Sequence, residues 1–296
     1  MDKHEEFAIT KRGTWLVNYI EVLKPRETIL LTFIGFCAAL VAWGGQPPLQ
    51  TGTLLLATLA ILLGSGGANG LTNYLDREVD ARMQRTRHRP IPSKRIFPAE
   101  KMLPLAISLV VIALIIAWFL HPLCFLFGSL GVIAASTWRK RITCVFPQGA
   151  VAGCAPVLIG YLAISHQLEL TLLFLCILIM VWIPLHVWSV MIANREDYRQ
   201  AGITYFPISW EVKDAIKVLL GLAVLLFGSA ITLYYFSDLG VPYLVVASIL
   251  GILMVLAAGH LVLTGVSHDA WLVYKLTAFP YLGILFLTMS LDLWLS

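Results

Sequence analysis

The chain has 296 residues, of which 59% are hydrophobic and only 13% charged, a composition outside the usual range of soluble domains. Its net charge is +4, and its five cysteines show no CxxC pairing, so neither a disulfide framework nor a cysteine metal site is expected. The lipid bilayer is therefore the expected solvent of this protein.

Apolar stretches recur along the whole chain, with lengths near the roughly 20 residues that a helix needs to cross a hydrocarbon core. We predict an all-α polytopic membrane protein, with about nine transmembrane helices in a bundle around a central chamber. Residues 1–27 are expected to form a cytoplasmic N-terminal segment, and residues 28–296 a single transmembrane domain. The predicted spans are 28–45, 50–74, 102–120, 122–138, 147–165, 169–192, 214–236, 241–264 and 273–294.

The distribution of charge predicts the orientation of these spans. With the N-terminus in the cytoplasm, all 21 Lys and Arg residues fall on the cytoplasmic side, and the opposite face keeps only Glu169, Asp238 and Asp292. Topology and anionic lipids then explain the net positive charge, and no nucleic-acid partner is expected. Because residues 1–27 contain five acidic residues, they do not resemble a mitochondrial import sequence, and a prokaryotic plasma membrane is expected.

The second predicted span ends in a stripe of polar side chains. At 100° per residue, Asn69, Asn73, Asp76 and Asp80 fall within an arc of about 60° on one helix face. Ionisable residues at membrane depth are costly and commonly mark a functional site. Two carboxylates one turn apart are able to hold a divalent cation.

A dense basic segment follows this stripe directly. Seven of the fourteen residues in 82–95 are Arg, Lys or His. Mg²⁺ is usually held by one or two carboxylates together with substrate phosphates, while Arg and Lys neutralise the remaining phosphate charge. The combination predicts a magnesium-diphosphate site. The alternative is that the carboxylates pair with neighbouring arginines at the membrane interface and that the basic run serves only topology.

A second polar cluster follows the sixth predicted span. Asn194 and Asp197 repeat the spacing of Asn73 and Asp76, which suggests two half-sites facing each other across the bundle. His186, within the span itself, is as compatible with simple packing as with a functional role.

These motifs resemble those of the heme O synthases, or protoheme IX farnesyltransferases, within the UbiA-type superfamily of intramembrane prenyltransferases. The resemblance covers roughly residues 20–290 and is most specific in 76–90 and 184–203, with support from 140–161. The chain departs from the usual superfamily pattern at position 72, where Thr72 replaces an asparagine. Thr72 and Asn73 are therefore both candidates to support the metal.

The resemblance implies transfer of a farnesyl group from farnesyl diphosphate to a vinyl group of heme b, with Mg²⁺ as cofactor and with water addition completing heme O. It assigns Asp76 and Asp80 to the metal, with Asn73 assisting. Asp197 and Tyr198 would cap the opposite side of the chamber through a second metal or a polar contact, and His186 would lie near the heme. Candidates for diphosphate contact are Arg85, Arg87, Arg89, Lys94, Lys140 and Arg141, with Arg85 and Arg89 favoured.

Two other functions remain open from the sequence. One is a UbiA-type prenyltransferase acting on a quinone, a chlorophyllide or a lipid. The other is a transporter or heme-handling scaffold, although its charges should lie near mid-membrane and not at helix ends as they do here. Contact with a downstream heme-modifying enzyme or a terminal oxidase is also left open.

Overall fold

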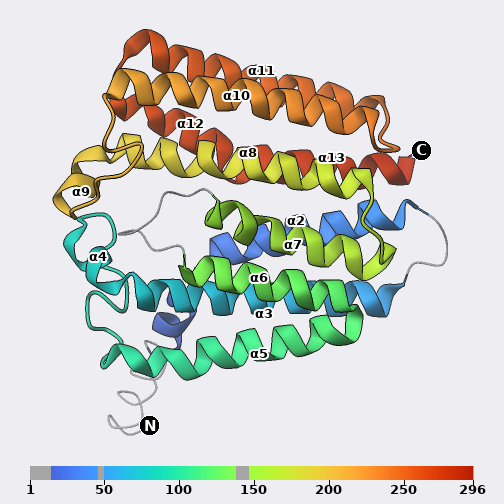
Figure 1. Cartoon of the computed structure of the whole chain (residues 1–296), viewed down its shortest axis with the longest axis horizontal. Helices are drawn as coiled ribbons and strands as arrows, with labels where there is room; N and C mark the ends of the chain where they lie inside the picture. Colours follow the sequence, from blue (N-terminus) through green and yellow to red (C-terminus); the bar gives the residue numbers. More distant parts are fainter. Residues whose placement is uncertain (1–14, 46–49, 138–146, 296) are drawn as a thin grey trace, which may run out of the picture.

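The computed structural model describes the backbone of residues 15–45, 50–137 and 147–295. Within these ranges the secondary structure is entirely helical, as predicted. The helices lie side by side in one bundle with their axes along a common direction (Figure 1).

Eight segments of the described residues are long and apolar enough to cross a membrane. Their helices, in chain order, are α2 (Pro25–Trp43), α3 (Thr51–Leu75), α5 (Leu103–Leu120), α7 (Gln148–Ser165), α8 (Leu170–Ala193), α10 (Val212–Tyr235), α11 (Val241–Thr264) and α12 (Ala270–Thr277) followed by α13 (Phe279–Leu295). Shorter elements are α4 (Arg77–Arg82), η1 (Ala99–Met102), α6 (Pro122–Thr137), α9 (Arg195–Gln200) and η2 (Ser267–Asp269).

Each predicted span contains a helix, but three details differ. The fourth helix, α6, is described over only 16 residues and is shorter than a typical span. The ninth expected span is broken at Ala278, whose ψ of −138° interrupts the helical backbone between α12 and α13. The polar stripe does not lie on one continuous helix either, because α3 ends at Leu75 and Asp76 (φ −88°, ψ 2°) separates it from α4.

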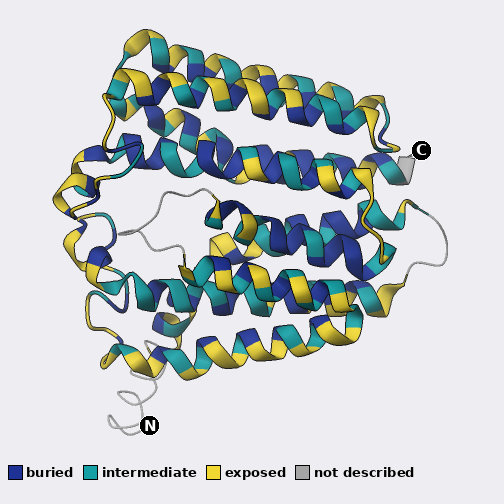
Figure 2. Ribbon diagram, in the orientation of Figure 1, coloured by how far each residue is buried: buried dark blue, intermediate teal, exposed yellow. Residues whose placement is uncertain are grey.

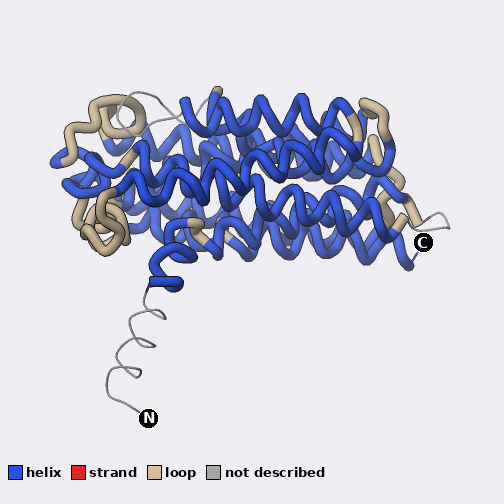
Figure 3. Tube along the Cα trace, turned by 90° about the horizontal axis from the view of Figure 1, so that it is seen from below, coloured by secondary structure: helices blue, strands red, loops and turns tan. Residues whose placement is uncertain are grey.

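The two polar connections lie at the same end of the bundle. α4 and α9 are neighbours at this end, whereas the C-terminal end of α13 is at the opposite end (Figure 1). The loops gather at both ends of the helices, and the middle of the bundle is helical (Figure 3). This arrangement brings together the two clusters that lie about 120 residues apart in the sequence.

The bundle is apolar outside as well as inside. Large hydrophobic side chains such as Phe119 and Leu263 are more than 80% exposed, and exposed positions recur along the outer helices (Figure 2). Helices satisfy their own backbone hydrogen bonds, so a helical surface of this kind is stable in hydrocarbon. The chain is therefore an integral membrane protein.

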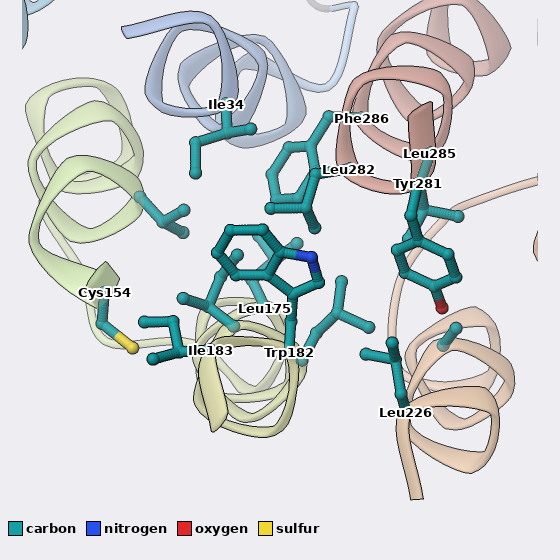
Figure 4. Close-up of a cluster of buried hydrophobic side chains, with 14 of the residues drawn as sticks. Ile34, Cys154, Leu175, Trp182, Ile183, Leu226, Tyr281, Leu282, Leu285 and Phe286 are labelled. Atoms are coloured by element: carbon teal, nitrogen blue, oxygen red, sulfur yellow. The ribbon is translucent and has the colours of Figure 1, made fainter. Parts of the chain in front are cut away.

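A buried tryptophan donates a hydrogen bond to the end of α12, beside its break from α13. Trp182 of α8 lies among side chains that include Ile34 of α2 and Phe286 of α13 (Figure 4). Its indole N–H donates a hydrogen bond to the carbonyl oxygen of Thr277, at 2.6 Å. A helix end leaves such carbonyl groups without helical partners, and this bond satisfies one of them.

Close backbone contact joins α2 to α7. A Cβ atom at Gly160 would overlap the carbonyl oxygen of Gly35, and a Cβ at Gly35 would lie 2.7 Å from the carbonyl oxygen of Pro156. Small residues permit helices to approach this closely in a membrane, where van der Waals packing drives their association.

We expect Gly160→Ala to lower the free energy of unfolding by about 1–3 kcal/mol, because the added methyl group collides with backbone and not with a flexible side chain. Thermal unfolding of the purified protein in detergent measures the effect. Gly221→Ala on α10 is the matched control, since a Cβ there meets nothing within 4 Å. Equal stability of the two variants would contradict the close packing of α2 on α7.

Candidate functional site

A cavity of about 370 Å³ lies inside the bundle, beneath the end that carries α4 and α9. Side chains from α2, α3, α5, α6, α7, α8 and α12 line it, together with side chains of the basic loop and of α9. Its volume is within the range of small-molecule sites.

The body of the cavity is apolar. The side chains and backbone there come from small or aliphatic residues, which leave room for a flexible hydrocarbon ligand. They include Ile34, Ile61, Ala113, Ala117, Gly128, Gly131, Val132, Gly153, Pro156, Ile159, Ile179 and Ile183.

The end of the cavity near α4 and α9 is polar and charged. The residues with polar side chains there are Lys24, Glu27, Asn69, Thr72, Asp76, Arg85, Arg89, His186, Tyr198, Tyr205 and Tyr274. An apolar chamber with one charged end matches a ligand that has a hydrocarbon tail and an anionic head.

Arg89 organises the charged end. Its Nη1 atom lies 3.0 Å from Asp80 Oδ2 and donates a second hydrogen bond to Asn73 Oδ1 at 3.3 Å. Asn73 in turn donates to the carbonyl oxygen of Val22, at 2.6 Å. The end of α3, α4, the basic loop and the segment before α2 are thereby joined in one network.

The two predicted metal-binding carboxylates occupy different positions. Asp80 is buried at 1% exposure, forms an ion pair with Arg89 and does not line the cavity. Asp76 lines the cavity, as do Thr72 and Asn69, whereas Asn73 is buried behind them. Helical spacing placed Asp76 and Asp80 together; in the structure Arg89 pairs with Asp80 while Asp76 faces the cavity, and binding of a metal by both carboxylates stays a prediction.

The donor set fits a magnesium ion shared with a substrate. No group of three or more His, Cys, Asp or Glu side chains in the described parts of the chain forms a closed metal cage. Mg²⁺ does not require one, because it retains waters and is completed by phosphate oxygens. Asp76, supported by the neutral side chains of Thr72 and Asn69, provides the carboxylate ligand such an ion needs.

Arg85 and Tyr198 form a second polar pair at the cavity. Arg85 Nη2 donates to the Tyr198 hydroxyl at 3.1 Å, whereas its buried Nε has no hydrogen-bond partner among the described residues. Burial raises the pKa of the Tyr198 phenol, although the Arg85 guanidinium acts in the opposite direction. Tyr198 is therefore protonated at neutral pH and, with Arg85, offers N–H and O–H donors to an anion.

Asp197 of α9 joins this helix to the basic loop that follows α4. Its carboxylate accepts hydrogen bonds from the backbone N–H groups of Gln84 (2.6 Å) and Arg85 (3.1 Å), in the basic loop. It does not line the cavity that Tyr198 lines, and it faces a separate polar groove. Asp197 therefore contacts the basic loop and not the chamber, and its predicted role in capping the chamber stays a prediction.

His186 is held between two aromatic rings. Its imidazole stacks on Trp182 at 4.8 Å between centroids, and on Tyr274 at the same distance. Nδ1 lies 3.1 Å from Thr277 Oγ1, and that hydroxyl donates to backbone carbonyl oxygens one turn earlier. With the Thr277 hydroxyl directed to those carbonyl oxygens, the geometry favours the tautomer in which Nδ1 donates to Thr277 and the other ring nitrogen keeps its lone pair.

The remaining predicted residues divide into two groups. Arg87 and Lys94 are exposed and do not line the cavity, whereas Lys140 and Arg141 lie outside the described residues. Lys24 and Glu27, which do line it, were not predicted as site residues. The sequence signal that they carry is a pair of opposite charges at the start of an apolar span, which does not show whether the pair faces a cavity.

Comparison with known proteins agrees with this geometry. The family model described as the UbiA prenyltransferase family matches residues 29–287. The chain belongs to the UbiA prenyltransferase family. As a member, it is a membrane-bound prenyltransferase with the helical architecture predicted from its sequence.

Individual relatives cover nearly the whole chain. A protoheme IX farnesyltransferase of Desulforudis audaxviator is 35% identical over 282 residues, or 94% of this chain and 88% of the relative. Two solved structures share the fold. A digeranylgeranylglyceryl phosphate synthase has a TM-score of 0.75 at 17% identity, covering 94% of this chain and 98% of that one. A UbiA homolog from Archaeoglobus fulgidus bound to DMAPP and Mg²⁺ has a TM-score of 0.64 at 14% identity, covering 90% and 99%.

Asp80→Asn tests the network around Arg89. We expect it to lower the free energy of unfolding by about 1–3 kcal/mol, because a charge-assisted hydrogen bond to a buried partner is lost. Asp76→Asn, at the more exposed cavity surface, should change stability less. Thermal unfolding of both purified variants provides the comparison, and an Asp76→Asn protein less stable than Asp80→Asn would refute the division of roles.

Proposed function

We propose that this prenyltransferase transfers a farnesyl group from farnesyl diphosphate to a vinyl group of heme b, in a Mg²⁺-dependent reaction that yields heme O. The observation that carries the proposal is the division of one cavity into a charged end and an apolar body. The close relationship to protoheme IX farnesyltransferases supports farnesyl diphosphate and heme b as the substrates.

The charged end would bind the diphosphate. Cleavage of the allylic C–O bond places negative charge on the leaving oxygens, and donors aimed at that position lower the barrier. Arg85 offers its unpartnered Nε, and Arg89 is fixed by Asp80 at the edge of the cavity. A magnesium ion held by Asp76 would add a positive charge that stabilises the departing diphosphate. Asn73 would assist indirectly, by positioning Arg89.

The apolar body would hold the prenyl tail and exclude bulk water. An allylic cation is rapidly captured by any nucleophile, so the chamber must admit the acceptor in preference to water. Aliphatic walls from α3, α5, α6 and α7 provide such an environment.

The imidazole of His186 would contact the heme. Stacking between Trp182 and Tyr274 fixes the orientation of the imidazole ring. Its unprotonated nitrogen is suited to bind the heme or to accept a hydrogen bond from it. Asp197 would keep the basic loop closed over the diphosphate through its bonds to the loop backbone.

The proposed location is a prokaryotic plasma membrane, with the charged end of the cavity on the cytoplasmic side. Support comes from the positive-inside rule, because the lysines and arginines all fall on that side in the predicted topology. The 28–296 segment would form a single transmembrane domain around the cavity.

Incubation of the purified protein with farnesyl diphosphate, Mg²⁺ and heme b tests the function. We expect mass spectrometry to detect heme O, and we expect EDTA to abolish it. Asp76→Asn should reduce product formation at least about 100-fold while the protein still inserts and folds, because it removes a carboxylate that acts in the transition state. Intact heme with no product from the wild-type protein would rule out heme b as the acceptor and direct the search to quinones, chlorophyllides and lipids.

A further inference from the structure

A second acidic side chain lines the cavity, and the proposed function gives it no role. Among the described residues that line the cavity, the acidic ones are Asp76 and Glu27. Glu27 belongs to the first turn of α2, in a different helix from Asp76. Its side chain is 61% exposed, and it is one of the residues that line the cavity.

Glu27 shares the polar end of the cavity with residues of both parts of the proposed site. Its Oε2 atom is 3.4 Å from Lys24 Nζ, and Arg89 and His186 line the same cavity. Arg89 belongs to the diphosphate end, and His186 belongs to the stacked aromatic group. The carboxylate therefore lies in the same chamber in which the prenyl carbon and the acceptor would meet.

The backbone holds Lys24 in an uncommon conformation beside it. Lys24 has φ 51° and ψ 66°, the left-handed region, and the next residue is Pro25. Non-glycine residues seldom adopt this conformation, and such residues are concentrated at functional sites. Both Lys24, which has this conformation, and its partner Glu27 line the cavity.

The second half of the proposed reaction requires a base. The vinyl π electrons form a bond from the terminal vinyl carbon to the farnesyl C1 atom, whose bond to oxygen has broken with its electron pair leaving on diphosphate. Positive charge then resides on the vinyl carbon attached to the porphyrin ring. A water oxygen adds to that carbon, and one proton of the water must be transferred to an acceptor before the hydroxyl group is complete.

We propose that Glu27 is the catalytic base that accepts this proton from the water. This inference rests on the proposed function and deepens it. Of the other candidates, Asp80 is paired with Arg89, Asp76 faces the metal position, and Tyr198 is protonated. His186, which also lines the cavity, is assigned above to contact with the heme. Lys24 Nζ lies 3.4 Å from the carboxylate, and polar groups at this end are able to hold the ordered water that adds to the cation.

The test compares the products of Glu27→Gln with those of the wild-type protein. The amide has nearly the same shape but cannot accept the proton. Because general bases contribute about 10²–10⁴-fold, we expect formation of the hydroxylated product to fall by at least about 100-fold. Part of the intermediate cation should instead lose a proton from carbon, giving a farnesylated porphyrin that is lighter by one water. The KM for farnesyl diphosphate should change little, since the diphosphate end is intact.

Two further variants separate catalysis from structure. Glu27→Asp retains a carboxylate and should restore a large share of the hydroxylated product. Asp214→Asn is the matched control, because Asp214 also stands in the first turn of a helix and pairs with a lysine three residues away, Lys217, but does not line the cavity. It should leave the ratio of the two products unchanged.

The possible results are distinguishable by mass spectrometry. An unchanged ratio and rate in Glu27→Gln would overturn the inference, and so would an equal loss of both products in a protein that still binds farnesyl diphosphate. Absence of any farnesylated porphyrin from the wild-type protein would contradict the proposed function instead.

Discussion

The ion pair between Arg89 and Asp80 is the interaction on which the charged end of the bundle depends. A carboxylate at 1% exposure would be strongly unfavourable without a partner, and Arg89 supplies one while also donating to Asn73. Asn73 in turn donates a hydrogen bond to the backbone carbonyl oxygen of Val22. One guanidinium group therefore fixes the path of the basic loop relative to α3, α4 and the segment before α2. That path places Arg85 at the cavity.

The chamber works because charge is confined to one end of it. Electrostatic interactions are much stronger in the low dielectric of a membrane bundle than in water, so a few fixed donors are enough to bind a diphosphate and stabilise its departure. The apolar body has the complementary role of holding the tail away from water. The halves of the chain meet at this end through hydrogen bonds, because Asp197 accepts from the backbone of Gln84 and Arg85. The two half-sites suggested by the repeated Asn-x-x-Asp spacing are therefore in contact.

Hydropathy predicted the spans well because crossing a bilayer requires long apolar helices, and α3 lies within one residue of its predicted range of 50–74 at each end. The break at Ala278 was not predicted, although Pro280 signals it in the sequence, because a proline lacks the N–H that would bond to the carbonyl oxygen four residues earlier. Helical periodicity placed Asp76 and Asp80 on one face but gave no indication that Arg89, nine residues after Asp80, folds back onto it. Glu27 was missed for a similar reason: a charge in the first turn of a span is ordinary at an interface, and only the packed bundle shows that it faces a cavity.

The central claim is that the charged end binds a prenyl diphosphate together with Mg²⁺. Calorimetric titration with a farnesyl thiodiphosphate, which resists cleavage, measures this binding without any acceptor. We predict saturable binding that requires Mg²⁺ and that Arg85→Gln weakens roughly tenfold or more, the loss expected for a charge-assisted hydrogen bond. Equal affinity with and without Mg²⁺, together with unchanged affinity in Arg85→Gln, would contradict the account.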